Sequence, residues 1–277
     1  MGKKLFLVDA DKCTSCKLCM IACKDEHVDA SYAPWTGPQP ETGHFWVDVR
    51  PLERGKIPRV KMTYLPVFCQ HCEDAPCIAA CPEDAIETRA DGLVWIDEKA
   101  CTGCGACEPA CPYDVIFMNG DRNVAQKCTG CAHRVDEGLE PRCADVCPHD
   151  AILFGEETDA IFAQKSGEKP LEDFHPEFEA APRVKWRGLP KPWIAGSVVD
   201  SDRDEIVAGV EVVATDIGSN ESFVTRTDAF GDFWLRELKD SATYRIDIRA
   251  AGYVPVAESV SLRGDRDLGT IALKAVR

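Results

Sequence analysis

This chain of 277 residues has few basic residues for its acidic ones and no long apolar run. It also has no cysteine after Cys147. Acidic residues outnumber basic ones by 47 to 32, which gives a formal net charge of −15. Because no basic excess is available to neutralise phosphates, we expect no nucleic-acid partner. No stretch approaches the roughly 18 consecutive apolar residues of a membrane-spanning helix, so no direct membrane span is predicted.

A secretion signal is also missing from the N-terminal residues, which contain neither an apolar core nor a twin-arginine motif. We therefore expect a cytoplasmic protein, with periplasmic export alongside a signal-bearing partner as the alternative. A disulfide framework fits poorly, since it would follow such a signal. None of the six histidines lies beyond His175, and the C-terminal part offers no nucleophile–base arrangement, so no catalytic residue is predicted on this chain.

The sixteen cysteines form four quartets along the sequence. The first and third have the spacing C-x2-C-x2-C-x3-C, the second C-x2-C-x4-C-x3-C and the fourth C-x2-C-x11-C-x3-C. A proline follows the last cysteine in three of them, at Pro82, Pro112 and Pro148. This run of cysteines and proline is the ligand pattern of bacterial ferredoxins that bind cubane iron–sulfur clusters.

The spacing has a geometric reason. Three cysteines in one tight loop can face one cluster, while the fourth lies past a bend and binds the other cluster of a pair. Four complete quartets therefore predict four 4Fe–4S clusters with ligands that cross between quartets. Zinc is the alternative for thiolate ligands, but zinc sites pair two-cysteine knuckles and need no third cysteine three residues on. Iron and sulfide content would separate the two.

An internal repeat indicates how the first part is organised. Residues 147–152 resemble residues 81–86, so a ferredoxin-like unit is duplicated within residues 1–154. Strands are expected at 4–9, 45–49 and 93–97, the second of them in an insertion at 30–66 that is rich in proline and aromatic residues.

The remainder of the sequence divides into a connector and a second domain. Prolines in residues 155–192 exclude one long helix, and we expect a short helix near 157–164 with the rest of the connector wrapped over a surface. Residues 193–277 predict a seven-stranded β-sandwich, because short alternating runs separated by turns recur there. These runs are 194–199, 210–214, 223–227, 233–235, 244–248, 256–262 and 268–273.

Three polar residues lie next to predicted ligands. His71 and His133 are expected to pack beside the cluster ligands or to lie at the surface, rather than to be ligands, since every quartet already has four thiolates. Lys127 has two interpretations, a charge that tunes a cluster and a solvated surface lysine.

The quartets resemble those of the iron–sulfur electron-transfer subunits that partner molybdopterin enzymes of the dimethyl-sulfoxide-reductase family. Residues 43–46, 52–59, 69–77 and 123–133 look like the small subunit of pyrogallol–phloroglucinol transhydroxylase or resorcinol hydroxylase. Residues 195–199, 227–233 and 250–253 are similar to the carboxypeptidase-regulatory-like sandwich. The resemblance implies an α+β fold, in which a duplicated bacterial-ferredoxin-like cluster domain is followed by that all-β sandwich.

The resemblance also implies how the ligands pair. In related subunits the first quartet shares its clusters with the fourth, and the second with the third. Carried over, the four ligand sets are Cys13, Cys16, Cys19 with Cys147; Cys128, Cys131, Cys143 with Cys23; Cys69, Cys72, Cys77 with Cys111; and Cys101, Cys104, Cys107 with Cys81.

The implied function is that of a non-catalytic electron-transfer subunit in a heterodimer. Its large partner would carry molybdopterin of the bis-guanine dinucleotide type and act on a hydroxylated aromatic compound in anaerobic phenol metabolism. The transhydroxylase small subunit lacks some ligand cysteines, whereas the third quartet is intact here, which suits exchange with a soluble electron donor or acceptor in a hydroxylase or dehydroxylase. The alternatives are a subunit of another molybdenum reductase or formate dehydrogenase, and a free-standing polyferredoxin.

Overall fold

The computed structural model describes residues 2–156, 158 and 170–276 of the chain. Contacts divide the protein into two compact units. The first comprises Met1–Leu52 and Thr63–Leu189, and the second Glu53–Met62 and Pro190–Arg277. The helix expected near 157–164 lies outside the described residues, apart from residue 158.

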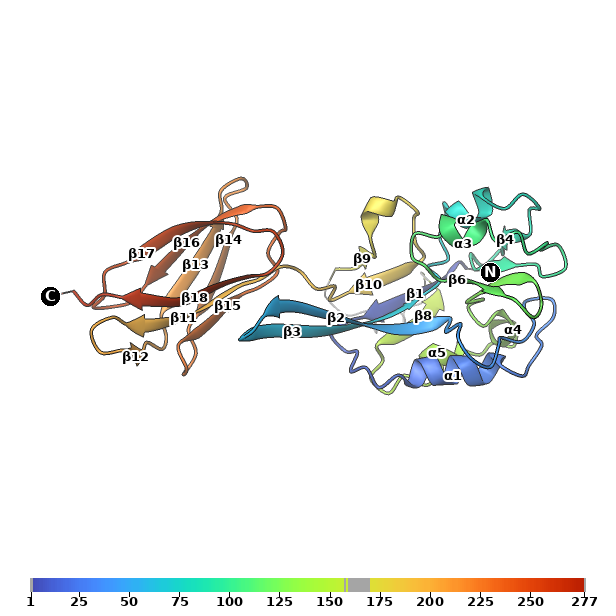
Figure 1. The fold of residues 1–277 in the computed structure, drawn as a ribbon, viewed down its shortest axis with the longest axis horizontal. Helices are drawn as coiled ribbons and strands as arrows, with labels where there is room; N and C mark the ends of the chain where they lie inside the picture. The colour runs from blue at the N-terminus through green and yellow to red at the C-terminus, as the bar shows by residue number, and fades with distance from the viewer. Residues whose placement is uncertain (1, 157, 159–169, 277) are drawn as a thin grey trace. The chain divides into compact units, whose positions relative to one another are not determined.

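A four-stranded sheet in the order β8–β1–β10–β9 organises the first unit (Figure 1). The predicted first strand is confirmed as β1 (Lys4–Asp9); it is antiparallel to β8 (Ile152–Glu156) and parallel to β10 (Val184–Arg187), which pairs with β9 (Glu172–Asp173). The expectation that the connector only wraps a surface is wrong. Trp186 on β10 is fully buried, because its strand lies in the interior of the sheet.

The helices of the described residues are short, and each contains a cysteine or begins directly after one. They are α1 (Leu18–His27), α2 (Pro76–Ala79), α3 (Cys107–Ala110), α4 (Ala132–Asp136) and α5 (Arg142–Asp145). The 3-10 helix η1 (Pro176–Phe178) is the exception, since it lies away from the quartets in the sequence. Such short helices gain little from their own backbone hydrogen bonds. Their conformation therefore depends on the packing around the cysteines.

Two hairpins follow the Cys-Pro dipeptides of the second and third quartets. They are β4 (Ile86–Thr88) with β5 (Val94–Ile96), and β6 (Ile116–Asn119) with β7 (Val124–Lys127). Strand β8 has the same place after the fourth quartet. The strand predicted at 93–97 is confirmed by β5, and the repeat seen in the sequence therefore recurs as repeated local structure.

The insertion forms a β-hairpin of β2 (Val47–Lys56) and β3 (Arg59–Phe68). The predicted strand at 45–49 is the beginning of this hairpin. Its outer part, Glu53–Met62, belongs to the second unit. There the largely buried guanidinium of Arg59 donates to the carboxylates of Asp232 at 2.7 Å and Asp267 at 2.9 Å, and to Ser197 Oγ. Charge-assisted bonds of this kind hold a polar hairpin tip in one orientation.

Besides this hairpin tip, the second unit contains two four-stranded sheets (Figure 1). One contains β11 (Ile194–Asp200), β12 (Glu205–Ile206), β15 (Asp232–Leu235) and β18 (Arg266–Leu273); the other contains β13 (Glu211–Asp216), β14 (Ser222–Arg226), β16 (Thr243–Arg249) and β17 (Val256–Ser261). All seven predicted runs are found as strands. The two-residue β12 is additional, and it is too short to leave an alternating pattern in the sequence.

Alternation of buried and exposed side chains explains these strands. In β13 and β16 every second residue is buried, as expected when one face of a strand meets a core and the other meets solvent. Tyr244 is fully buried in the apolar core of the unit, and its hydroxyl accepts a hydrogen bond from the backbone N–H of Lys239 at 2.8 Å.

Two phenylalanines in the second unit provide a stability test. Phe233 is 1% exposed and belongs to the core, whereas Phe230 is 75% exposed. We predict that Phe233→Ala lowers the free energy of unfolding of this unit by about 3–5 kcal/mol, through lost burial and a residual cavity. Phe230→Ala should change it by less than about 0.5 kcal/mol. Denaturant unfolding followed by tryptophan fluorescence measures both, and equal effects would show that the core is assigned wrongly.

Candidate metal centres

The sixteen cysteines gather in space into four groups of four. Three groups each line a pocket. We name the groups site 1 (Cys13, Cys16, Cys19, Cys147), site 2 (Cys23, Cys128, Cys131, Cys143), site 3 (Cys69, Cys72, Cys77, Cys111) and site 4 (Cys81, Cys101, Cys104, Cys107). The structure thus brings together the same sets of four that the resemblance implies, each taking one cysteine from a second quartet.

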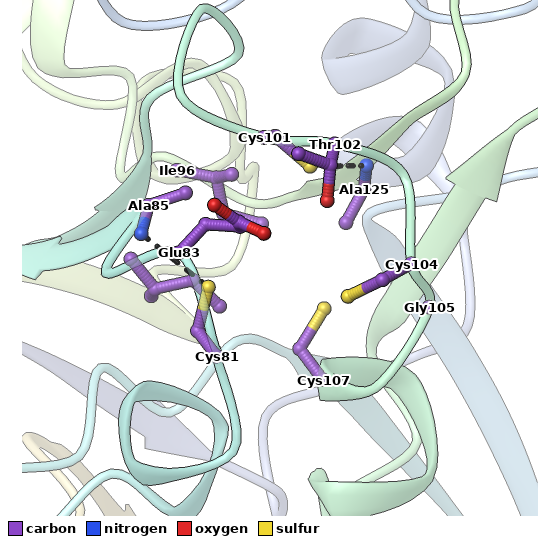
Figure 2. Close-up of a pocket in the computed structure, with 11 residues that line it drawn as sticks. Cys81, Glu83, Ala85, Ile96, Cys101, Thr102, Cys104, Gly105, Cys107 and Ala125 are labelled. Atoms are coloured by element: carbon purple, nitrogen blue, oxygen red, sulfur yellow. Dashed lines mark hydrogen bonds between the residues drawn. The ribbon is translucent and has the colours of Figure 1, made fainter.

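Site 4 shows the arrangement directly. In Figure 2 the sulfur atoms of Cys81, Cys104 and Cys107 point towards a common space, with Cys101 at its edge. In the part of the sequence that the structure describes, no three His, Cys, Asp or Glu side chains are arranged to hold a single metal ion. The thiols instead surround a volume suited to a group of several atoms.

The same local conformation recurs after the last cysteine of three quartets. The residue three positions on has a left-handed backbone in each case: Asp84, Asp114 and Asp150, with φ of 50°, 54° and 50°. Aspartate tolerates this conformation better than most residues. The backbone then turns back, so that the N–H of Ala85 donates to Cys81 Sγ and that of Ala151 donates to Cys147 Sγ, both at 3.3 Å.

A glycine is required beside Cys128. Gly130 has φ of +64°, and a Cβ there would lie 2.8 Å from the side chain of Leu93. The same residue donates its backbone N–H to Cys128 Sγ at 3.3 Å. The loop can therefore approach the sulfur closely only because this position has no side chain.

The four sites are neighbours in the order 1, 2, 3, 4. Burial is the main cause that raises the pKa of Cys143, Cys128 and Cys77, and a thiolate of the next site adds to it in each case. The neighbouring pairs are Cys19 with Cys143, Cys69 with Cys128, and Cys107 with Cys77. The two ends of the row reach the surface, since Cys16 of site 1 and Cys104 of site 4 are exposed.

Burial disfavours ionisation of these thiols. It raises the pKa of Cys19, Cys72 and Cys77 to about 12, and that of Cys107 to about 11. Since a metal ligand must be a thiolate, ionisation at neutral pH requires a compensating positive charge. The donor set therefore fits an iron–sulfur group, whose iron supplies that charge and whose preferred ligands are soft thiolates.

Lys127 is buried between sites 2 and 3. Its side chain is 2% exposed and donates to the carbonyl oxygens of Val94 and of Cys128, the latter at 3.0 Å. Burial raises the pKa of Cys77 and Cys128, and the ammonium of Lys127 lowers both. The interpretation of Lys127 as a solvated surface lysine is therefore wrong. The other interpretation remains, in which its charge lies close to sites 2 and 3.

Histidines lie close to site 2. His71 Nε2 is 3.9 Å from Cys128 Sγ, and His27 Nε2 is 3.7 Å from Cys131 Sγ. Burial keeps both rings neutral, because it lowers the pKa of His27 to about 3 and that of His71 well below its ordinary value. His133, which the sequence places beside cluster ligands or at the surface, directs its Nε2 at Glu26 at 3.0 Å.

Sequence reasoning missed His27, although a signal was present. His27 follows Cys23 by four residues on α1, and residues at this spacing share one face of a helix. A histidine on the cysteine-bearing face of α1 therefore had to approach the same group of thiols.

Comparison with protein families agrees with the division into two units. Residues 10–32 match a 4Fe–4S binding domain, residues 60–157 a 4Fe–4S dicluster domain and residues 193–274 a carboxypeptidase regulatory-like domain. Together with four groups of four thiols, these matches define the class: an iron–sulfur protein with ferredoxin-like cluster domains and an appended carboxypeptidase-regulatory-like domain.

Similarity to individual proteins narrows the class further. The pyrogallol hydroxytransferase small subunit of Pelobacter acidigallici is 35% identical over 260 residues, which are 91% of this chain and 92% of that protein. An anaerobic dimethyl sulfoxide reductase subunit of Escherichia coli is 37% identical over 54% of this chain, and a tetrathionate reductase subunit of Salmonella typhimurium is 36% identical over the same share. The matches cover 72% and 56% of those two relatives. This protein belongs to the family of iron–sulfur electron-transfer subunits of dimethyl-sulfoxide-reductase-type molybdoenzymes.

The buried charge of Lys127 leads to a prediction about reduction potentials. Lys127→Met should make the clusters nearest to it, those of sites 2 and 3, harder to reduce, because the reduced form carries one more negative charge. We expect at least a tenfold change in the reduction equilibrium, or about 59 mV for one electron. Potentiometry monitored by electron paramagnetic resonance (EPR) measures the shift. Lys239→Met, which removes an exposed lysine paired with Glu221, is the control and should shift nothing.

Proposed function

We propose that sites 1 to 4 each hold one 4Fe–4S cluster, with the four cysteines of each site as its ligands. The observation that carries this proposal is the convergence of sixteen thiols into four groups of four, each completed by a cysteine from a different quartet. Backbone N–H groups directed at sulfur in these loops support it, since such donors are typical of cluster sites.

We infer that the protein relays electrons as the non-catalytic subunit of a molybdenum oxidoreductase. When bound, the clusters supply centres that gain and lose one electron each. The fold holds the sites in a row, buries all four cysteines of site 2 and three of the four of site 3, and leaves Cys16 and Cys104 exposed at the two ends. Such a row suits transfer between a large subunit that carries molybdopterin bis-guanine dinucleotide and a soluble electron donor or acceptor.

A hydroxylated aromatic substrate for the large subunit is part of this proposal. Its support is the relative named pyrogallol hydroxytransferase small subunit, which matches along nearly the whole chain, including the C-terminal unit. The relatives named for dimethyl sulfoxide and tetrathionate reductases match only about half of it. They favour the alternative of another molybdenum reductase. The second unit would serve to dock or stabilise this assembly.

A cytoplasmic location is proposed, with export alongside a signal-bearing partner as the alternative. In the described residues, no helix is both long and apolar enough to cross a membrane.

Anaerobic purification of the native complex tests the proposed function. We expect about sixteen iron and sixteen acid-labile sulfide atoms per chain, four of each per cubane, together with a molybdenum-containing large subunit and phenol-dependent redox activity. Elemental analysis and mass spectrometry of one fraction measure this. Iron and sulfide without molybdenum would leave a free polyferredoxin, and zinc without sulfide would contradict the cluster assignment.

The crossing of ligands gives a separate prediction. Cys147→Ser should abolish or alter the same EPR signal as Cys13→Ser, although Cys147 belongs by sequence to the quartet of Cys128. Cys23→Ser should likewise act on the same signal as Cys128→Ser. If Cys147→Ser instead reproduced the spectrum of Cys128→Ser, each quartet would bind its own cluster and the proposed ligand sets would be wrong.

A further inference from the structure

Site 2 has a different environment from the ends of the row. Its four cysteines are between 3% and 5% exposed, whereas sites 1 and 4 each contain an exposed cysteine. In the described part of the sequence, two histidines each place a ring nitrogen within 4 Å of a cysteine sulfur, and both sulfurs belong to site 2. Backbone N–H groups of Gly130 and Arg142 also donate to its sulfurs, at 3.3 and 3.5 Å.

His71 is held with its proton directed at Cys128. Its Nδ1 accepts a hydrogen bond from the backbone N–H of Val94 at 3.0 Å, so Nδ1 carries no proton and Nε2 carries one. That nitrogen is the one 3.9 Å from Cys128 Sγ. The ring is fully buried and lies nearly parallel to that of Phe6, with ring centres 6.0 Å apart, which fixes its orientation. By sequence, however, His71 lies between Cys69 and Cys72 of site 3.

His27, at the end of α1, contacts the same site. Its Nε2 is 3.7 Å from Cys131 Sγ, while its buried Nδ1 has no hydrogen-bond partner among the described residues. Because Cys131 Sγ is the acceptor beside Nε2 and none lies beside Nδ1 among the described residues, the geometry places a proton on Nε2. The ring packs against Trp46, with centroids 4.7 Å apart, and is 1% exposed.

We propose that His27 and His71 donate Nε2–H to the thiolates of Cys131 and Cys128 and thereby make the site 2 cluster easier to reduce than it would be without them. This inference rests on the proposed function, because it requires a cluster in site 2. Reduction adds one negative charge that is spread over the sulfur atoms, and a directed N–H group stabilises the reduced form more than the oxidised form. Neither histidine becomes a ligand or transfers its proton.

Replacement of each histidine in the holoprotein tests the proposal. His27→Phe and His71→Phe keep a buried ring but remove the donor. Both should shift the same single EPR signal to a more negative potential, by about tenfold in the reduction equilibrium or about 59 mV each. The shared signal is the one that Cys128→Ser abolishes. Because His71 lies between two ligands of site 3, an effect of His71→Phe on the signal that Cys69→Ser abolishes would overturn the proposal.

Two comparisons separate a specific donor from a structural role. His27→Gln and His71→Gln retain an N–H donor and should restore part of the lost potential. His44→Phe is the matched control: the His44 ring stacks on Phe117 at 5.2 Å and should leave all four potentials unchanged. If His44→Phe shifted the site 2 signal equally, the effect would be general packing and the inference would fail.

A measurement on the unmodified protein is independent of how the variants fold. Electron–nuclear double resonance of the reduced site 2 cluster, in H₂O and D₂O, should show two exchangeable side-chain protons beyond those of the backbone. Their absence would overturn the inference. Iron and sulfide analysis of the same sample separates the two proposals. Fewer than four cubanes contradicts the proposed function, whereas four cubanes without these proton couplings contradicts only the role of the histidines.

Discussion

The structure of the first unit depends on keeping buried thiols close together in groups of four. Thiols with pKa values raised to about 12 by burial, such as Cys72 and Cys77, can ionise together only beside strong positive charge. This constraint accounts for the short helices, the left-handed aspartates and the N–H groups directed at sulfur. It also links distant segments, because each group takes one cysteine from another quartet. A bound cluster would therefore act as a cross-link as well as a redox centre.

Lys127, His71 and His27 form a second layer around these thiols. Each is almost fully buried and contacts either a cysteine sulfur or a neighbouring carbonyl group. Buried polar groups are retained where they are hydrogen-bonded, and with clusters bound their positive charge or N–H groups would compensate negative sulfur. They are concentrated on sites 2 and 3, in the middle of the row. The two ends of the row instead have exposed cysteines, as expected where electrons enter and leave.

Much of the fold was accessible from the sequence because its signals are local. The quartets, the repeat of residues 81–86 at 147–152 and the alternating runs of the sandwich depend on neighbours within about ten residues. The pairing of β10 with β1 was not accessible, since parallel strands meet across a long connection and a short run such as Val184–Arg187 carries no sign of its partner. The same holds for the outer part of the hairpin, whose Arg59 finds Asp232 and Asp267 far along the sequence.

The sequence by itself determined the kind of site and the number of thiols, because ligand type and spacing are written in each quartet. It also determined the family, through motifs that extend along nearly the whole chain. The tertiary structure decided the environment of each site. His71 lies between two cysteines of site 3 in the sequence but faces Cys128 of site 2, and Lys127 is buried rather than solvated. Burial and orientation depend on what packs around a residue, and those neighbours come from distant segments that meet only when the protein folds.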